Sequence, residues 1–294
     1  MPAVSILDES LRRAYYEAGV WWSIWPVSQS ECILENGGRR MKRIAINGLG
    51  RIGRAVFKLI IEEEALEIVA VNDLLDADHL AYLLNYDTVY GRYSNRVSAD
   101  GATLVVGDRR IQVLSERDPA KLPWKDLDID LVVESTGLFT EMEKAKAHLL
   151  AGAKQVAISA PTKSPELATA VHGVAHPESK EPRIFSCASC TTNSITPVVE
   201  VMGRRIGVKK AVLTTVHAYT ASQQLVDSPS KKRRTGRAAA QNIVPSSTGA
   251  AIATTKVLPE YAGKFDGRSL RVPVPVGSIS DITFVTERTT SVDE

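Results

Sequence analysis

The sequence predicts an α/β fold in which a Rossmann-type, doubly wound domain is followed by an α+β domain with a mixed or antiparallel sheet. Short apolar runs alternate with helix-patterned segments from Arg43 onward, and a glycine-rich turn joins the first run to the first helix. Such alternation is typical of a parallel sheet covered by helices on both faces. After Cys190 the strand-like segments become longer and some alternate apolar with polar residues, which indicates the second domain.

The first domain begins with a strand–helix–strand unit. Arg43–Asn47 is a short apolar run, Arg51–Ile61 repeats apolar residues at helical spacing, and Glu67–Asn72 is the next apolar run. Further strands are expected at Thr103–Val106, Ile111–Leu114, Leu131–Glu134, Gln155–Ser159 and Ala170–Val174, with a helix at Met142–Leu150.

The second domain starts with a helix-like segment at Ser194–Met202. Pro273 and Pro275 predict that the strand at Ser269–Val276 is an edge or bulged strand, because proline cannot donate to a ladder. The other expected elements are strands at Ala211–Val216 and Asp281–Glu287, a long polar loop at Ala221–Arg237, and a helix that begins near Ser247-Thr248-Gly249.

The composition is that of an ordinary globular protein, since 44% of the 294 residues are hydrophobic and 24% are charged. The formal net charge of +2 is too small to indicate binding to nucleic acid or to an anionic membrane. The most apolar N-terminal stretch, Gly19–Val27, is too short to cross a bilayer. These properties favour a soluble protein without a membrane partner.

The three cysteines, Cys32, Cys187 and Cys190, do not form a disulfide framework, and their low, odd number fits a reducing, cytoplasmic environment. Cys187 and Cys190 have a C-x-x-C spacing. No second pair and no suitably spaced histidine accompany them, so no metal site is expected.

Residues 1–40 differ from the rest of the chain. Trp21, Trp22 and Trp25 crowd there without helix or strand periodicity, and a clean strand begins just after Met41. We interpret Met41 as the natural start and residues 1–40 as an upstream translation artefact. The alternative is a genuine N-terminal extension, since termini often lack packed structure; the intact mass of the native protein distinguishes the two.

The glycine-rich turn is a dinucleotide-binding motif in its required context. Gly48, Gly50 and Gly53 fit G-x-G-x-x-G between a predicted strand and a predicted helix. The glycines allow a pyrophosphate to approach the helix N-terminus. Asp73 ends the second strand, and a carboxylate there binds ribose hydroxyls and repels a 2′-phosphate, which favours NAD over NADP. The alternative is a structural turn beside a solvated acid.

Cys190 precedes a predicted helix within a polar run, Ser189-Cys190-Thr191-Thr192-Asn193. A helix N-terminus favours the nucleophilic thiolate over the thiol. His217 could act as its base, which would make the chain an enzyme with covalent catalysis. Alternatively, the cysteine is an inert core residue and the histidine is structural.

Three cationic or anion-binding features accompany this pair. The run Lys231–Arg237 is open to three interpretations: a nucleic-acid patch, a solvated loop or an anion site. Thr248-Gly249 resembles an anion-binding helix start, and Arg271 is a cation in an apolar strand that needs a partner. Together they indicate a substrate that carries phosphate.

From Met41 to the end, the chain resembles the phosphorylating, NAD-dependent glyceraldehyde-3-phosphate dehydrogenases. The matching stretches are Asn47–Arg54, Ser135–Phe139, Ser159–Pro161, Ser189–Asn193, His217–Thr220, Gly236–Ala239, Ser247–Ala251 and Arg271–Pro273.

The resemblance implies that the Cys190 thiolate attacks the aldehyde and that His217 is the general base. It implies that Thr220 and Arg271 hold the substrate phosphate, and that the attacking phosphate is held by Ser189, Thr191, Thr248 and Gly249, joined by Arg237. The implied cofactor residues are Gly48, Gly50, Arg51, Ile52, Gly53, Asp73, Arg117, Thr136, Gly137 and Ser159.

The resemblance further implies a cytoplasmic homotetramer of glycolysis or gluconeogenesis that uses NAD, glyceraldehyde 3-phosphate and inorganic phosphate. In it, the loop at Asp227–Pro229 would reach a neighbouring subunit's cofactor. Residues 41–189 would form the NAD-binding Rossmann domain and residues 190–294 an incomplete catalytic domain.

The chain also departs from the family pattern. The segment Pro273–Ser278 differs, and the sequence given stops at Glu294, before a family segment that includes a closing helix and an asparagine that orients the nicotinamide. We therefore expect weak or no activity and partial exposure of the nucleotide-domain core. The alternatives are an erythrose-4-phosphate dehydrogenase, a non-catalytic thiol redox sensor or RNA-binding protein, and an inactive truncated fragment.

Overall fold

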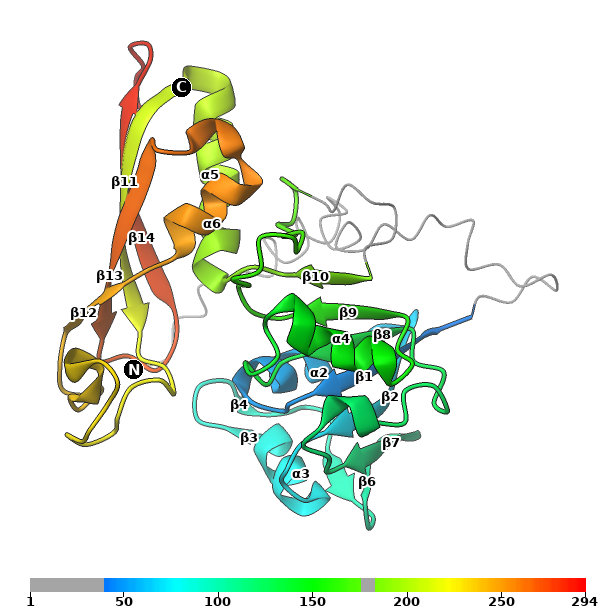
Figure 1. The fold of residues 1–294 in the computed structure, drawn as a ribbon. Helices are drawn as coiled ribbons and strands as arrows, with labels where there is room; N and C mark the ends of the chain where they lie inside the picture. The colour runs from blue at the N-terminus through cyan, green and yellow to red at the C-terminus, as the bar shows by residue number, and fades with distance from the viewer. Residues whose placement is uncertain (1–39, 176–182) are drawn as a thin grey trace. The chain divides into compact units, whose positions relative to one another are not determined.

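The computed structural model describes residues 40–175 and 183–294. The interpretation of residues 1–40 therefore falls, apart from Arg40, outside the described residues. An eight-stranded sheet has the order β10-β9-β8-β1-β2-β7-β6-β5 (Figure 1). Its strands are β1 (Lys42–Asn47), β2 (Leu66–Asn72), β5 (Val97–Ala99), β6 (Thr103–Val106), β7 (Arg109–Leu114), β8 (Leu131–Glu134), β9 (Gln155–Ile158) and β10 (Ile184–Ser186).

The six strands from β10 to β7 pair in parallel, while β6 and β5 add antiparallel pairs at one edge. β1 pairs with β2 on one side and with β8 on the other. The chain therefore changes direction across the sheet at β1, and such a switch point leaves a ligand-binding crevice at the carboxyl ends of the strands. This confirms the predicted doubly wound topology.

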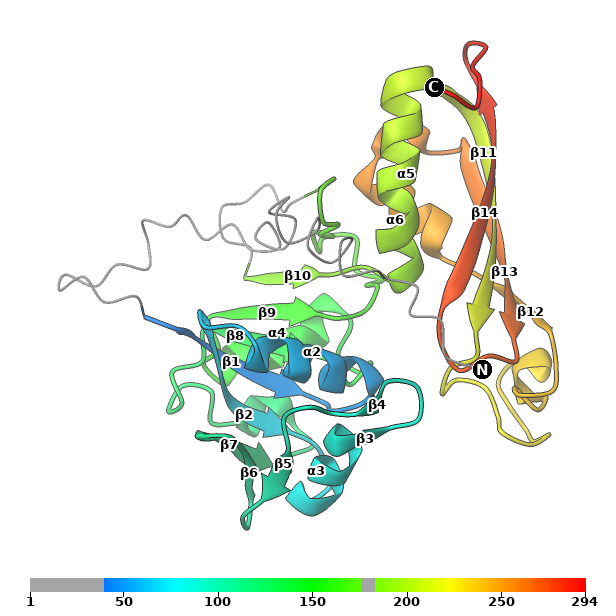
Figure 2. The same cartoon turned by 180° about the vertical axis from the view of Figure 1, so that it is seen from behind.

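Helices α2 (Arg51–Ile61) and α4 (Met142–Leu150) lie on opposite faces of this sheet (Figures 1 and 2). α2 has the bounds predicted from its apolar spacing, and it buries Phe57 and Ile60. The remaining elements here are α3 (Ala77–Asn85), the short strands β3 (Tyr86–Asp87) and β4 (Gly91–Arg92), and the 3₁₀ turn η2 (Pro119–Lys121).

A second, four-stranded sheet has the order β12-β13-β11-β14. β11 and β13 are parallel and the other pairs are antiparallel, so the sheet is mixed, as predicted. Its strands are β11 (Val208–Ala218), β12 (Val244–Ser247), β13 (Phe265–Val272) and β14 (Ser278–Thr286), and its helical elements are α5 (Cys190–Ile206), η3 (Arg233–Gly236), α6 (Ala250–Val257) and η4 (Pro259–Tyr261).

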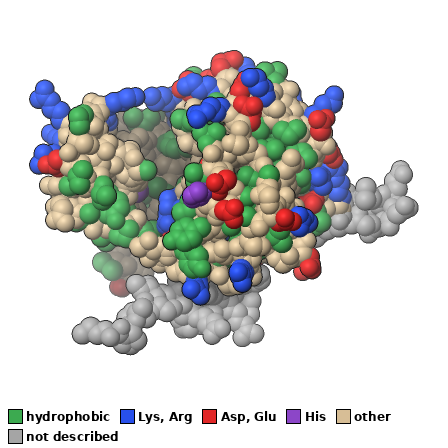
Figure 3. Space-filling view, turned by 90° about the horizontal axis from the view of Figure 1, so that it is seen from below, with side chains coloured by type: hydrophobic (Ala, Val, Ile, Leu, Met, Phe, Trp, Pro, Cys, Tyr) green, Lys and Arg blue, Asp and Glu red, His purple; other side chains and the backbone are tan. Residues whose placement is uncertain are grey.

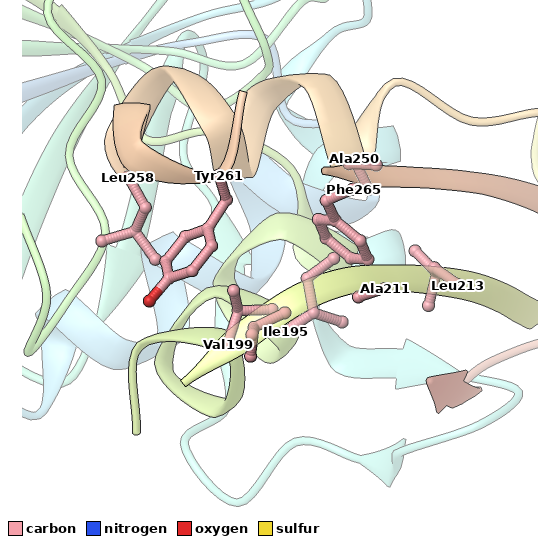
Figure 4. Packing of buried hydrophobic residues seen from close by; sticks show 10 residues of the cluster. Ile195, Val199, Ala211, Leu213, Ala250, Leu258, Tyr261 and Phe265 are labelled. Atoms are coloured by element: carbon pink, nitrogen blue, oxygen red, sulfur yellow. The ribbon is translucent and has the colours of Figure 1, made fainter. Parts of the chain in front are cut away.

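Helices α5 and α6 cover one face of this second sheet. Ile195 and Val199 of α5 pack with Leu213 of β11 and Phe265 of β13 in a buried cluster (Figure 4). Residues that alternate with this cluster point to the opposite face. Among them, Val212, Ile279 and Val285 remain 55%, 72% and 54% exposed, so that face presents apolar side chains to solvent.

Two strand predictions were wrong. Ala170–Val174 is a turn with isolated bridges, because Gly173 adopts a left-handed φ of +75° that breaks an extended strand. The strand predicted at Ser269–Val276 instead spans Phe265–Val272, ends before Pro273, and lies between β12 and β11. It is therefore not an edge strand, since both prolines fall in the turn that follows it.

No helix in the described part of the chain has the length and apolar character needed to cross a membrane.

Candidate active site

Cys190 is the first residue of helix α5, which begins four residues before the predicted start at Ser194 and still places the cysteine at a helix N-terminus. Ser189 is the N-cap, and its hydroxyl accepts a hydrogen bond from the Thr192 backbone N–H at 3.0 Å. The Asn193 side chain donates to the carbonyls of Cys187 and Ser189 at 2.8 and 2.9 Å, which fixes the turn into the helix. The Cys190 side chain is exposed, so a substrate can reach the sulfur.

Ala188, two residues before the nucleophile, has a φ of +59°. A left-handed conformation costs a residue with a β-carbon on the order of 1 kcal/mol. The turn is held by the Ser186 hydroxyl, which accepts from the Ala188 N–H at 3.1 Å. Backbone strain of this kind often accompanies functional sites, since surrounding contacts must support it.

The Cys190 sulfur lies 3.3 Å from Nε2 of His217 on β11. On the other side of the ring, Nδ1 lies 2.8 Å from the Ala218 carbonyl and 2.6 Å from Nη1 of Arg271. Because a guanidinium can only donate, Nδ1 accepts from Arg271 in this conformation, and the ring proton is on Nε2, where it faces the sulfur. Nε2 becomes a proton acceptor when Arg271 leaves Nδ1 and Nδ1–H donates to the Ala218 carbonyl. The structure thus brings together the predicted nucleophile and the predicted base.

Cys187 has a different environment from Cys190. Burial raises the pKa of the Cys187 thiol to about 11, because desolvation disfavours the thiolate. Cys187 is therefore a poor nucleophile near neutral pH.

A cavity of about 210 Å³ surrounds the Cys190–His217 pair. Five of the predicted phosphate ligands line it: Ser189, Thr191, Thr248, Gly249 and Arg271. Sequence reasoning missed the lining residues Thr192, Thr215 and Ser269. Because Thr215 is a polar residue on the covered face of β11, alternation along that strand was the signal that could have revealed it.

The cavity suits an anion. The Thr215 hydroxyl oxygen is buried and has no hydrogen-bond partner among the described residues. Arg271 is half-buried, and burial lowers its pKa while the Cys190 charge raises it; a guanidinium stays protonated despite such shifts. Within residues 40–175 and 183–294, no carboxylate forms an ion pair with Arg271.

Two predicted phosphate ligands do not line this cavity. The hydroxyl of Thr220 lies 2.9 Å from that of Ser222. Arg237 forms an ion pair with Asp227 at 2.6 Å, and the same carboxylate accepts from the Ala238 N–H at 2.9 Å. In this conformation the Thr220 hydroxyl and the Arg237 guanidinium have their partners within the loop, Ser222 and Asp227.

The predicted cofactor residues gather at the carboxyl ends of the parallel strands. The Gly48–Gly53 turn follows β1, Asp73 follows β2, and Arg117 follows β7. Thr136 and Gly137 follow β8, and Ser159 follows β9. This edge of the sheet is where doubly wound folds bind nucleotides.

The glycine turn fits a pyrophosphate. Gly48 has a φ of +91°, and a β-carbon there would meet the Thr136 backbone N at 2.8 Å. A β-carbon on Gly53 would lie 2.0 Å from the Gly48 carbonyl oxygen. Gly50, the N-cap of α2, has no side-chain cap and no atom within 4 Å of its β-carbon position. The helix N-terminus is therefore open for an anion.

Some side chains around the glycine turn already have partners within the protein, and others are exposed. The Asp73 carboxylate accepts from the Leu49 and Leu75 backbone N–H groups at 2.8 and 3.1 Å, which places it beside the turn. Arg51 forms an ion pair with Asp87 and lies over the Tyr90 ring. Ile52 is 54% exposed on the first turn of α2, where a cofactor can contact it.

Both halves of the chain match families of known proteins. A model described as the NAD binding domain of glyceraldehyde 3-phosphate dehydrogenase matches residues 42–142, and one described as its C-terminal domain matches residues 189–294. The chain is 51% identical over 255 residues to glyceraldehyde-3-phosphate dehydrogenase 1 of Streptomyces arenae, which covers 86% of this chain and 76% of the relative. It is 48% identical over 256 residues to the enzyme of Streptomyces coelicolor, with the same shares covered.

The chain belongs to the glyceraldehyde-3-phosphate dehydrogenase family. The match to the family's NAD binding domain identifies NAD as the cofactor, in agreement with Asp73 and the open glycine turn. Among the described residues, no cluster of histidine, cysteine or acidic side chains could hold a metal ion. On the face shown in Figure 3, Lys and Arg side chains lie at several separate positions among acidic and apolar ones.

Sequence reasoning missed a buried polar network beneath the NAD site of this family member. Asn47, Asn72 and Glu134 end three neighbouring strands, and each is at most 5% exposed. Asn72 donates to Asn47 at 2.7 Å, and Asn47 donates to Glu134 at 2.6 Å. His148 of α4 completes the network at 3.0 Å from Glu134. Polar residues at the ends of adjacent parallel strands were the available signal.

Proposed function

We propose that this chain catalyses the NAD-dependent oxidative phosphorylation of D-glyceraldehyde 3-phosphate to 1,3-bisphosphoglycerate, a step of glycolysis and, in reverse, of gluconeogenesis. The proposal depends above all on the 3.3 Å contact between the Cys190 sulfur and His217 Nε2. The relatives that carry this enzyme's name support it.

The first half of the reaction forms a thioester. The Cys190 thiolate adds to the aldehyde carbon, and the aldehyde oxygen takes the proton that His217 holds, which gives a hemithioacetal hydroxyl next to a neutral His217. His217 Nε2 accepts that proton as the carbon loses a hydride, which leaves an acyl group on the sulfur. Bound NAD supplies the hydride acceptor. The Cys190 backbone N–H, free at the helix N-terminus, stabilises the oxyanion.

The second half transfers the acyl group to inorganic phosphate. The phosphate oxygen attacks the thioester carbon, the carbon–sulfur bond breaks, and the thiolate is regenerated with release of the acyl phosphate. We assign Ser189, Thr191, Thr248 and Gly249 to the attacking phosphate, with Arg237 joining them. We assign Arg271 and Thr220 to the phosphate of the substrate.

Arg237 and Thr220 can bind phosphate only after a local change in the loop. Arg237 must exchange its Asp227 partner for phosphate, and Thr220 must turn from Ser222. A phosphate carries more negative charge than a carboxylate and accepts the same bidentate hydrogen bonds, so the exchange is chemically reasonable.

The cofactor residues divide by role. Gly48, Gly50 and Gly53 admit the pyrophosphate, and Asp73 binds the ribose hydroxyls. We assign Arg51, Ile52, Arg117, Thr136, Gly137 and Ser159 to the remaining surface of NAD.

We further propose that residues 41–189 form the NAD-binding domain and residues 190–294 the catalytic domain, and that the protein is a cytoplasmic homotetramer. Val212, Ile279 and Val285 on the open face of the second sheet support association, because exposed apolar faces mark interfaces. Light scattering coupled to size exclusion measures the oligomeric state.

The decisive assay follows NADH formation at 340 nm with glyceraldehyde 3-phosphate, with and without inorganic phosphate. Phosphate-dependent NADH formation at a low rate, which the Cys190→Ser variant lacks, is the expected result. Erythrose 4-phosphate serves as the competing substrate, and a higher kcat/KM for it would assign the activity to erythrose-4-phosphate dehydrogenase instead. Peroxide reactivity of Cys190 without NADH formation would indicate a redox sensor.

A further inference from the structure

Thr215 of β11 lines the Cys190 cavity from the side of the second sheet. Alternate residues of a strand share one face, and three register pairs of β11 and β13 lie on the face that α5 and α6 cover. From the hydrophobic core toward the end of β11, these pairs are Leu213 with Gly267, Thr215 with Ser269, and His217 with Arg271. Thr215 and Ser269 therefore form a row of hydroxyls between the apolar core and the row of the proposed base.

The Thr215 side chain is shielded from solvent, and its hydroxyl is unsatisfied. The residue is 1% exposed, and its Oγ1 has no hydrogen-bond partner within residues 40–175 and 183–294. A buried polar group without a partner destabilises the folded state. Valine has nearly the same shape, is also common in strands and carries no polar group. Folding alone therefore does not favour a hydroxyl at this position.

Other groups that line the cavity attract anions. Helices α5 and α6 both begin there, and the free N–H groups of a helix N-terminus favour negative charge. The Thr248 hydroxyl accepts from the Ala250 N–H at 3.1 Å, so its own proton remains available to a ligand. None of the described residues that line the cavity is acidic. An anion there can accept hydrogen bonds from both helices and from the Thr215 hydroxyl.

Thr215 lies on the side of the cavity where α6 begins. Ala250, the first residue of α6, belongs to the same buried cluster as Leu213, two residues before Thr215 (Figure 4). Thr248 and Gly249, which we assign to the attacking phosphate, immediately precede Ala250. The Thr215 hydroxyl is therefore grouped with the ligands of that phosphate.

Arg271, which we assign to the phosphate of the substrate, reaches in the other direction. Its Nη1 lies 2.6 Å from His217 Nδ1 and donates to the Ala218 carbonyl at 3.0 Å. Ala218 is the last residue of β11, roughly 10 Å along the strand from Thr215. The two ends of the cavity thus offer separate sets of donors.

We propose that the Thr215 hydroxyl is a further ligand of the attacking phosphate, an inference that rests on the proposed function. Donation to an anionic phosphate oxygen satisfies the buried hydroxyl and gives a charge-assisted hydrogen bond. Because phosphate enters only in the second half of the reaction, this bond supports phosphate binding and leaves formation of the thioester unaffected.

Thr215→Val removes the hydroxyl and keeps the shape of the side chain. Binding of inorganic phosphate is measured at Cys190, as the concentration that halves the rate of its alkylation by iodoacetamide at constant ionic strength. An anion beside the sulfur disfavours the thiolate, which is the form that reacts. This concentration should rise at least about tenfold in Thr215→Val, because a hydrogen bond to a charged group is lost. Thr215→Ser keeps the hydroxyl and should restore the protection.

Thr214→Val is the matched control. Thr214 is the neighbouring residue of β11 on the opposite face, where its hydroxyl accepts from Arg268 Nε at 3.3 Å, and its loss should leave the protection by phosphate unchanged. Thermal unfolding without phosphate should find Thr215→Val at least as stable as the parent chain, since an unsatisfied group has been removed. A purely structural threonine would instead give a less stable variant with unchanged phosphate binding.

Several outcomes would overturn the assignment of Thr215. They are undiminished protection by phosphate in Thr215→Val, equal loss of protection in Thr214→Val, and absence of protection in the parent chain. The alkylation assay requires neither NAD nor turnover, so protection that depends on Thr215 without any NADH formation would support this phosphate ligand and contradict the dehydrogenase activity. Phosphate-dependent NADH formation with an unchanged KM for phosphate in Thr215→Val would overturn the ligand alone.

Discussion

The indole nitrogen of Trp124 lies 3.0 Å from Nδ1 of His148, and both side chains are fully buried. An indole N–H can only donate, so His148 Nδ1 must accept. The ring proton of His148 is then on Nε2, where it faces the Glu134 carboxylate at 3.0 Å. The geometry therefore specifies a neutral histidine beside a buried carboxylate.

Glu134 also fixes Thr136, which adjoins the glycine turn. Its other oxygen accepts from the Thr136 backbone N–H at 2.8 Å and from the Thr136 hydroxyl. The Thr136 backbone packs so closely against Gly48 that a β-carbon on residue 48 would not fit. The network thus holds two strand ends at the spacing that the glycine turn requires.

Glu134→Gln should weaken NAD binding more than it lowers kcat. The amide presents donors where Asn47, His148 and Thr136 already donate, and one unsatisfied buried group costs about 1–3 kcal/mol. Urea unfolding measures the loss of stability, NAD titration measures the change in Kd, and steady-state kinetics measure kcat. The exposed Glu143→Gln in α4 is the control, and unchanged NAD affinity in Glu134→Gln would contradict the positioning role. Nitrogen NMR shifts of His148 should report the Nε2–H form in the parent protein.

His217→Asn should lower kcat by roughly 10²–10⁴-fold, the usual contribution of a general base. The asparagine cannot take the hemithioacetal proton, although Cys190 and the cavity remain. Stopped-flow measurement of NADH formation isolates the chemical step. A rise in KM with kcat intact would mean that His217 only helps to bind substrate.

The two described cysteines should differ in alkylation. Because burial raises the pKa of Cys187 to about 11, only on the order of one part in a thousand is thiolate at pH 8, and that fraction rises with pH toward 11. Iodoacetamide at pH 8 should therefore label Cys190 and spare Cys187, as peptide mapping by mass spectrometry detects. Comparable labelling of both in the folded protein would refute the burial argument.

The sequence predicted best the elements whose residues show a local apolar pattern, and it failed for those that depend on long-range pairing. Apolar spacing alone predicted the bounds of α2. The helix predicted at Ser194–Met202 left out the first turn of α5, because the polar run Ser189–Asn193 carries no apolar spacing. β12 could not be predicted this way, because Val-Pro-Ser-Ser has neither alternation nor strong β propensity and becomes a strand only by pairing with β13. Position along the chain likewise does not reveal that Arg237 meets Asp227.

Gly48→Ala should destabilise the protein and abolish tight NAD binding. The new β-carbon would meet the Thr136 backbone N at 2.8 Å, at a φ of +91° that alanine rarely adopts. We expect a loss of about 1–3 kcal/mol in unfolding free energy. Gly107→Ala is the matched control: its φ of +57° imposes the left-handed strain, but nothing lies within 4 Å of its β-carbon position. If Gly107→Ala lost as much stability as Gly48→Ala and NAD affinity survived in both, the contact with Thr136 would have no role. A larger loss at Gly48, accompanied by a rise in the Kd for NAD, would assign the effect to the close approach of the turn to the end of β8.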